Sequence, residues 1–301
     1  MPDAAILLST YNGERFLSEY LESLSQQSFD RIVLYVRDDC STDGTKSLLE
    51  RTKFRFPIIT VPGGGRLGPA RSFLTLLEAA SGRHGSYHFA DQDDIWLPER
   101  VRTAHDAVIS RISPLLFHAP PQPVNVAGHP IGAQPTSKVP SFANALVENC
   151  VVGCTSAIND SAAKLVIQGT PRQIAMHDWW SYLIVSSFGE IQTGPRPEVL
   201  YRQHGGNLVG ANFGLSTRIT GKIARLCRRG LRAPPLMEQL AEFLRIHGDS
   251  LRSDHRSAVE TIIACQHSLH HRVKVAMRPP FHRHSPIDQM LLRVALVLGR
   301  A

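Results

Sequence analysis

The 301-residue chain lacks any apolar run close to the roughly 20 residues that a bilayer-spanning helix needs. Its first residues also lack the basic start and long apolar core of a secretory signal, so we expect them to enter a strand directly. Cysteine is scarce, and five scattered residues, an odd number, favour reduced thiols in a cytoplasmic protein over a disulfide framework. Apolar residues make up 43% and charged residues 20%, which excludes a fibrous or wholly disordered chain.

The net charge of +7 is unevenly distributed along the chain. Residues 1–212 carry 18 Lys and Arg against 20 Asp and Glu, whereas residues 213–301 carry 15 against 6. We therefore expect one domain over 1–212 and a basic, mainly helical extension over 213–301. A basic extension fits contact with anionic lipid, contact with nucleic acid, or a solvated helical face, and the sequence leaves these alternatives open.

Strand and helix signals alternate through the first third of the chain. Apolar runs predict strands and helical spacing predicts helices, in alternating order, at residues 4–8, 16–24, 32–36, 45–51, 58–61, 70–80 and 87–90. This alternation predicts an α/β fold with a mostly parallel sheet and helices on both faces. Ligands of such sheets bind beyond the carboxyl ends of the strands, where this sequence places acidic residues.

The remainder of the chain is less regular. Residues 114–140 hold seven prolines, which predicts a loop with at most short edge strands. An extended apolar pattern resumes at 147–158, and helices are expected at 161–168, at 177–188 and over most of 218–298.

Two acidic clusters close neighbouring strands. Asp91 and Asp93 are two positions apart directly after a strand, so they can share one divalent cation such as Mg²⁺ or Mn²⁺. An Asp-x-Asp triplet alone is a weak signal, because acidic loops are usually just solvated. Asp38 and Asp39 close the preceding strand, where they fit either a polar ligand or the cap of the next helix.

Several motifs occur in an order that resembles a known family. They are STYNGE at 9–14, RDDCSTDGT at 37–45, FADQDDIW at 89–96, NCVVGCT at 149–155, MHDWW at 176–180 and YRQHGGN at 201–207. Together they resemble a family 2 glycosyltransferase of the GT-A fold, and their wording is similar to the bacterial rhamnosyltransferase-like branch. The resemblance covers about residues 4–212. It implies a Rossmann-like catalytic domain and an inverting sugar transfer from a nucleotide-sugar donor.

The resemblance also implies which residues bind the donor and a cation. Residues after the first strand frame the nucleotide, carboxylates after the second accept a hydrogen bond from the base or ribose, and arginines meet phosphate or a base edge. The implied nucleotide-sugar-binding residues are Thr10, Tyr11, Asn12, Glu14, Asp38, Asp39, Arg71, Asp91, Gln92 and Arg202. Asp91, Asp93 and His204 would hold Mg²⁺ or Mn²⁺, which stabilises the departing nucleoside diphosphate.

Asp178 is the implied catalytic base, which takes the proton of the acceptor hydroxyl. An aspartate with an ordinary pKa near ~4 is a weak base, and partial desolvation by Trp179 and Trp180 is a way to raise that pKa. Taken without the family, the residues favour Asp178 as a cap of the helix that follows.

Three positions depart from the family pattern. Ser72 stands where asparagine is frequent, Cys40 where glycine is common, and His118 where an acidic residue is expected. These departures leave open a degenerate protein that binds a sugar nucleotide without chemistry. A nucleotidyltransferase is disfavoured, because no glycine-rich basic loop follows the first strand.

The favoured hypothesis is a cytoplasmic transferase, working at the inner face of the membrane. It would move a sugar, with L-rhamnose as the leading candidate, from a dTDP- or UDP-sugar to a glycan or lipid-linked saccharide. Amphipathic basic segments at 219–232 and 287–298 either contact the membrane or pack on the catalytic domain. Nucleic acid is not an expected partner, and a nucleic-acid-binding protein is the less favoured alternative.

Overall fold

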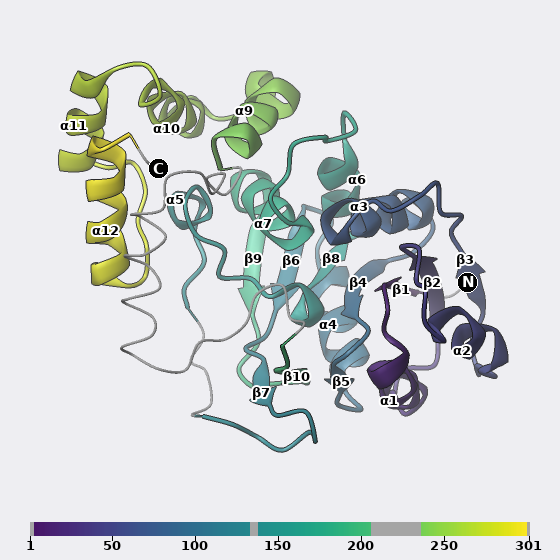
Figure 1. Ribbon diagram of the computed structural model, residues 1–301. Coiled ribbons are helices and arrows are strands. Elements are labelled where there is room, and N and C mark those ends of the chain that lie inside the picture. The colour runs from purple at the N-terminus through teal and green to yellow at the C-terminus, as the bar shows by residue number, and fades with distance from the viewer. Residues whose placement is uncertain (1–2, 133–137, 206–235, 300–301) are drawn as a thin grey trace.

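The computed structural model describes residues 3–132, 138–205 and 236–299. Its centre is a seven-stranded sheet in the order β3-β2-β1-β4-β8-β6-β9, with helices on both faces (Figure 1). The strands are β1 (Ala4–Thr10), β2 (Ile32–Asp38), β3 (Ile58–Thr60), β4 (Ser86–Asp91), β6 (Leu115–His118), β8 (Ala157–Asn159) and β9 (Glu190–Thr193). Pairing is parallel except at β8, which runs antiparallel to both β4 and β6.

A smaller sheet brings distant segments beside the end of β4. It consists of β5 (Ile95–Trp96), β10 (Val199–Arg202) and β7 (Gln122–Val124), in the order β5-β10-β7. β10 runs antiparallel to β5, which follows β4 after a short turn. The residues just after β10 therefore lie near the acidic turn after β4.

Helices of the first two thirds cover both sheet faces. They are α1 (Glu14–Ser25), α2 (Thr45–Arg51), α3 (Pro69–Ala80), α4 (Arg100–Ile109), α5 (Phe142–Ala145), α6 (Asp160–Ile167) and α7 (His177–Phe188), with the short 3₁₀ helix η1 (Gly153–Thr155). Strand β1 shows why both faces need cover. Ala5 and Leu7 belong to the core that contains α3 and α7, while Ile6 and Leu8 belong to the core that contains α1. Alternate residues point to opposite faces, so a strand covered on both sides is apolar throughout.

The C-terminal helices lie beyond the β9 edge of the sheet (Figure 1). They are α9 (Leu236–His247), α10 (Ser253–Ala264), α11 (Leu269–Met277) and α12 (Pro286–Val297), with η2 (Gly248–Ser250). Phe243 of α9 packs edge-on against Trp180 of α7, with ring centroids 6.2 Å apart. The described C-terminal helices thus share a core with the sheet, and the expected boundary at residue 212 lies outside the described residues.

The α/β architecture with a mostly parallel sheet is confirmed, as are the helices expected at 45–51 and 177–188. The prediction of a loop with at most edge strands over 114–140 is wrong at β6, which is a buried interior strand between β8 and β9. Its four residues lie between prolines without containing one, so the ladder is not interrupted. The extended segment expected at 147–158 is also wrong, because only β8 and the turn η1 form there. None of the described helices is both long and apolar enough to cross a membrane.

Candidate active site

The candidate site forms at the carboxyl ends of β1, β2 and β4. Thr10 at the end of β1 is in register with Asp38 of β2, and Ser9 is in register with Asp91 of β4. Parallel pairing places these chain ends at one edge of the sheet. Residues that are 28 to 81 positions apart in sequence are hydrogen-bonded here.

Asp38 is held in place by its neighbours at the strand ends. Thr10 Oγ1 donates to its Oδ1 at 3.0 Å, and the Ser41 amide donates to its Oδ2 at 2.9 Å. Lys46 Nζ lies 3.6 Å from Oδ2, and the Asp38 side chain keeps 14% of its surface exposed. Asp38 is therefore oriented and still reachable from solvent.

Asp39 has a different place from the predicted one. Its carboxylate pairs with Arg37 Nη1 at 2.6 Å, and the two side chains are 5% and 0% exposed. The amides of Leu67 and Gly68 donate to its two oxygens, each at 2.7 Å. Burial acts to raise the pKa of Asp39, but these hydrogen bonds and the guanidinium lower it below its usual value. Asp39 thus anchors the loop that enters α3, which corrects the prediction that it faces the nucleotide.

The loop after β1 is tied to the turn after β2. Asn12 Oδ1 accepts from the Thr42 amide at 2.8 Å, and Glu14 Oε2 accepts from the Gly44 amide at 2.9 Å. These contacts explain the residue types, since Asn12 has φ of 46°, a left-handed conformation that asparagine tolerates. Glu14 therefore joins the two loops, and its predicted reach to the sugar or base stays a prediction.

Tyr11 and Gln92 link the β1 loop to the acidic turn. The Tyr11 amide donates to Gln92 Oε1 at 3.0 Å, and Gln92 Nε2 donates to the Tyr11 carbonyl at 2.8 Å. The guanidinium of Arg66 stands 4.0 Å from the centre of the exposed Tyr11 ring. The guanidinium therefore covers one face of the ring in a cation–π contact, and Tyr11 as a whole keeps 36% of its surface exposed.

The start of α3 explains one departure from the family pattern. Ser72 is fully buried, and Arg37 Nη1 donates to its hydroxyl. The small side chain leaves space for the guanidinium that holds Asp39. Arg71, one position earlier, is exposed on the first turn of α3.

Cys40, the second departure from the family pattern, has a strained backbone conformation. Its φ is 69°, in the left-handed region where a glycine is free of the clash between Cβ and the carbonyl. The position is therefore one where glycine fits the turn better than cysteine does.

His118 belongs to the core of the sheet. It is 3% exposed on β6, and its Nε2 is 3.1 Å from Thr193 Oγ1 on β9. Burial lowers its pKa to about 4, so it is neutral near pH 7. His118 supports the sheet rather than replacing an acidic group in the cleft.

Three acidic side chains converge at the end of β4. Burial raises the pKa of Asp91 well above its usual range, and the negative charges of Asp93 and Asp178 raise it further. Asp91, Asp94 and Cys154 each offer a possible metal-ligand atom, and these three atoms lie within 4.8 Å of one another. Among the described residues this is the one group of three or more His, Cys, Asp or Glu side chains that lie so close together. A concentration of carboxylates with poor solvation is what a divalent cation stabilises.

Asp93, in the turn between β4 and β5, lies against His204, which follows β10. His204 Nε2 is 2.7 Å from Asp93 Oδ2, and the imidazole stacks on Phe16 with centroids 4.9 Å apart. The structure thus brings together two of the three residues predicted to hold a cation, with Phe16 fixing the ring.

Arg202 is a positioning residue at this corner. Its side chain is 1% exposed, and it donates through Nε to the Asp93 carbonyl at 2.9 Å and through Nη2 to Glu19 Oε2 at 2.6 Å. Its amide donates to Asp94 Oδ1 at 3.0 Å. These bonds hold the acidic turn, and they correct the prediction that Arg202 pairs with phosphate.

Asp178 lies opposite the acidic turn, on the first turn of α7. Its Oδ1 accepts from the Trp179 amide at 2.7 Å and its Oδ2 from the Gly153 amide at 3.1 Å, and Asn149 adds a side-chain hydrogen bond. Burial outweighs these bonds and raises the pKa of Asp178 to about 6. The N-cap position of α7 is Met176, so Asp178 is not the N-cap residue, but its carboxylate does satisfy the first-turn amide of Trp179.

Gly153 allows the close approach to Asp178. A Cβ at this position would stand 2.8 Å from His177 Nε2, nearer than packed atoms allow. The glycine therefore lets its amide reach the carboxylate. The turn η1 that carries it follows Asn149, so one segment supplies two of the partners of Asp178.

Sequence reasoning missed Phe16, Glu19 and Arg66. Phe16 and Glu19 have the spacing of ordinary helix residues, and Arg66 lies in a glycine-rich loop, so nothing in the sequence marks them as site residues. Tertiary packing alone brings them to the site. Arg37 offered a signal, since a charged residue inside an apolar strand needs a buried partner.

Comparison with known proteins agrees with this geometry. Residues 5–108 match the model for glycosyl transferase family 2. The chain is 28% identical over 231 residues to the dTDP-rhamnosyl transferase RfbG of Shigella flexneri, covering 70% of this chain and 76% of that protein. It is 26% identical over 159 residues to the E. coli glucosyltransferase WfgD, covering 52% and 59%. The crystal structure of S. aureus TarS 1–349 with UDP-GlcNAc shares the fold, with a TM-score of 0.59 at 14% identity over 99% of this chain and 82% of that one.

Proposed function

Residues 5–108 form a glycosyl transferase family 2 domain within a chain of the GT-A fold, and we propose that this enzyme transfers a sugar with inversion. The observation that carries the proposal is the convergence of Asp91, Asp93 and Asp178. The charges of Asp93, in the turn after β4, and of Asp178, on α7, both act on Asp91 at the strand end. The arrangement offers a place for a diphosphate and cation beside a lone carboxylate that accepts a proton.

The donor we propose is a dTDP- or UDP-sugar, with dTDP-L-rhamnose first. Similarity to RfbG, which is named a dTDP-rhamnosyl transferase, supports this choice. The nucleoside would lie over the accessible ring of Tyr11, with Asp38 accepting a hydrogen bond from the base or ribose. Arg71, exposed at the start of α3, would meet the base edge or a phosphate.

For a Mg²⁺ or Mn²⁺ ion we propose Asp91, Asp93 and His204 as ligands, although the ligand atoms that already lie within 4.8 Å of one another belong to Asp91, Asp94 and Cys154. Asp91 and Asp93 supply oxygen ligands, and His204 supplies a ring nitrogen that lies 2.7 Å from Asp93. A cation here would offset the burial, and the repulsion from Asp93 and Asp178, that together raise the pKa of Asp91. When bound, it supplies charge stabilisation to the departing nucleoside diphosphate.

Asp178 would act as the general base. With a pKa near 6, its carboxylate is mostly ionised at neutral pH and is a stronger base than an exposed aspartate. Three hydrogen bonds fix its direction, so it would take the proton of an acceptor hydroxyl as that oxygen attacks the anomeric carbon. The sugar leaves its nucleoside diphosphate from the opposite face, which gives inversion.

We further propose a cell-surface glycan or lipid-linked saccharide as the acceptor. The name of WfgD describes a diphosphoundecaprenol-linked acceptor, which supports this class. The enzyme would work in the cytoplasm at the inner face of the membrane. Residues 1–212 would form the catalytic domain and 213–301 the basic extension.

A donor screen tests this function. The purified chain is titrated with dTDP- and UDP-sugars by calorimetry in the presence of Mn²⁺, and donor hydrolysis is then measured. The proposal expects one donor to bind and to be cleaved slowly to the free sugar. Binding without hydrolysis or transfer to any saccharide acceptor would instead identify a degenerate, sugar-nucleotide-binding protein.

A further inference from the structure

The outermost two helices expose an unusual number of large apolar side chains. On α11 these are Leu269, Val273 and Met277, which are 61%, 40% and 72% exposed. On α12 they are Ile287, Met290, Val294 and Leu298, just past its end, which are 52%, 58%, 46% and 54% exposed. Contiguous exposed apolar surface marks an interaction site more often than scattered single residues do.

The spacing of these residues puts each set on one face of its helix. Positions 269, 273 and 277 recur every four residues, and positions 287, 290, 294 and 298 recur at three and four. The buried residues of the same helices, Val275 on α11 and Leu292 and Leu296 on α12, lie on the opposite side. Each helix is thus apolar on its inner face and again on its outer one.

Basic side chains run beside the apolar face of α11. His270, Lys274 and Arg278 follow Leu269, Val273 and Met277 by one position each, and all three are exposed. Residues 269–298 hold five Lys and Arg and a single carboxylate, Asp288. An apolar stripe flanked by a basic one matches the surface of an anionic bilayer, where apolar groups enter the acyl boundary and cations meet headgroups.

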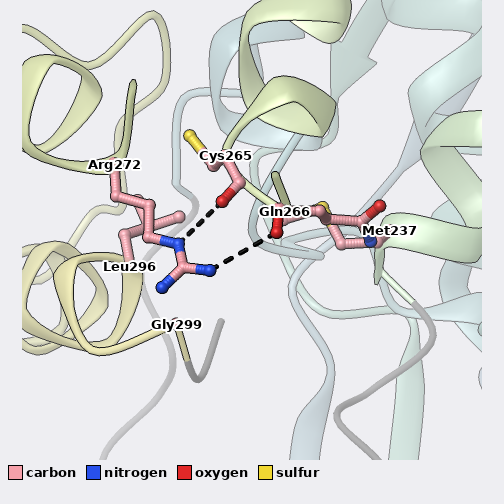
Figure 2. Close-up of a pocket in the computed structure, with 6 residues that line it drawn as sticks. All are labelled: Met237, Cys265, Gln266, Arg272, Leu296 and Gly299. Carbon is pink, nitrogen blue, oxygen red and sulfur yellow. Dashed lines mark hydrogen bonds between the residues drawn. The ribbon is translucent and has the colours of Figure 1, made fainter. Parts of the chain in front are cut away.

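The two helices are held firmly to the rest of the molecule. Arg272 of α11 donates to the carbonyls of Cys265 at 2.8 Å and Gln266 at 3.4 Å, across a cavity of about 260 Å³ that Met237 and Leu296 also line (Figure 2). This bond fixes the orientation of α11 against the end of α10. Arg272 is accordingly an internal tether and not part of the basic row.

The loop between α11 and α12 is also joined to the segment that supports Asp178. His284 Nδ1 lies 2.9 Å from Glu148 Oε2, and Arg283 Nη2 donates to the Val147 carbonyl at 3.0 Å. The next residue along the chain, Asn149, hydrogen-bonds to Asp178. A surface bound by α11 and α12 would therefore be held in a fixed relation to the base.

We propose that the outer faces of α11 and α12 form a docking surface for an anionic lipid bilayer, on which the protein lies without crossing it. Nucleic acid would use the basic row but leave the apolar stripes in water. A second copy of this chain would present the same basic row and repel it. The proposal deepens the membrane location proposed above and rests on it, but it does not depend on the sugar transfer itself.

Vesicle flotation of the full chain tests the proposal. Vesicles of phosphatidylcholine alone are compared with vesicles that also contain phosphatidylglycerol. The protein is expected to float with the anionic vesicles, less so as salt rises. The double variant Met277→Ser/Met290→Ser and the double variant Lys274→Glu/Arg278→Glu are each expected to bind about tenfold more weakly.

Two control variants match these changes away from the surface. Ile112→Ser removes an apolar side chain that is 94% exposed, and Lys53→Glu reverses an exposed charge near β3. Both are expected to float like the unaltered chain, and a circular dichroism spectrum of every variant that matches the unaltered chain confirms that it is folded. Flotation of all variants alike, no flotation of the unaltered chain, or a dimer in light scattering that the Met277→Ser/Met290→Ser variant dissociates would each overturn the proposal. Since vesicle binding needs no turnover, failure here is distinct from failure of the proposed transferase activity.

Discussion

The carboxylate of Asp178 on α7 is close enough to Asp91 at the end of β4 for its charge to raise the pKa of Asp91. The two residues are separated by eight intervening elements of secondary structure. Their proximity places a proton acceptor opposite the acidic turn that we propose as the cation and diphosphate site. The predictions for the catalytic base and for the cation site depend on this proximity of Asp178 and Asp91.

The pH dependence of turnover should report Asp178. Burial raises its pKa from 3.8 to about 6, and the base must be ionised to accept a proton. The rate should therefore be maximal above pH 6 and fall about tenfold per pH unit below it. Measurement of kcat/KM from pH 4.5 to 8 checks this, and a rate that stays constant down to pH 4.5 would exclude Asp178 as the base.

The cation site can be tested by removing one ligand. Asp93→Asn keeps the shape but loses the charge that faces His204, so Mn²⁺ binding in the presence of nucleotide should weaken by at least about tenfold. Calorimetry with Mn²⁺ and a nucleoside diphosphate gives the affinity, and Asp30→Asn, an exposed acid elsewhere, serves as the control. Unchanged Mn²⁺ affinity in the Asp93 variant would place the cation elsewhere.

The buried pair of Arg37 and Asp39 should contribute strongly to stability. Asp39→Ala would leave the fully buried guanidinium without its carboxylate, and we expect a loss of about 3–5 kcal/mol in the free energy of unfolding. Asp3→Ala removes one partner of an exposed pair with Arg31 and should cost about 0–1 kcal/mol. Urea unfolding compares the two, and equal losses would contradict the structural role of Asp39.

The same pair predicts a pH effect on folding. The pKa of Asp39 is lowered in the folded chain, so its stabilisation is complete above the unfolded value near ~4 and is lost as pH falls through the folded value. Stability measured between pH 5 and 3 should decline, and less steeply in Asp39→Asn. If the free energy of unfolding fell equally steeply with pH in both proteins, groups other than Asp39 would be responsible for the loss of stability in acid.

Cys40 offers a substitution that should stabilise the protein. Because its φ is 69°, Cys40→Gly relieves a steric cost of about 1–2 kcal/mol, partly offset by the greater freedom of glycine when unfolded. We expect a net gain of about 0.5–1 kcal/mol by urea unfolding. Cys40→Ser keeps the Cβ and should give no gain. A glycine variant no more stable than the serine variant would contradict this reading of the turn.

The sequence predicted the catalytic half of the fold well for a physical reason. The strands of the first third are covered on both faces, so each is a continuous apolar run that ends at a polar turn, and both features are visible in sequence. β6 was missed because prolines on either side dominated its short apolar run. β9 and β10 are four residues each and carry no strong period, so nothing local distinguishes them.

The site was predicted in its residues more than in their roles. The proposed roles of Asp38, Asp93, His204 and Asp178 stay predictions, whereas Asp39 and Arg202 are buried supports. Sequence spacing shows that an acidic or basic side chain is near a strand end but not which way it points. Hydrogen bonds from Leu67 and Gly68, which decide the role of Asp39, come from a loop 28 residues away.

The most direct test of the central claim compares Asp178→Asn with the unaltered enzyme on the donor that the screen identifies. Asparagine keeps the size of the side chain but cannot accept the proton, so sugar transfer should fall by about 10²- to 10⁴-fold. Nucleotide affinity should change by no more than about twofold, because Asp178 is not among the proposed nucleotide contacts. Transfer at an undiminished rate by the asparagine variant would contradict the account.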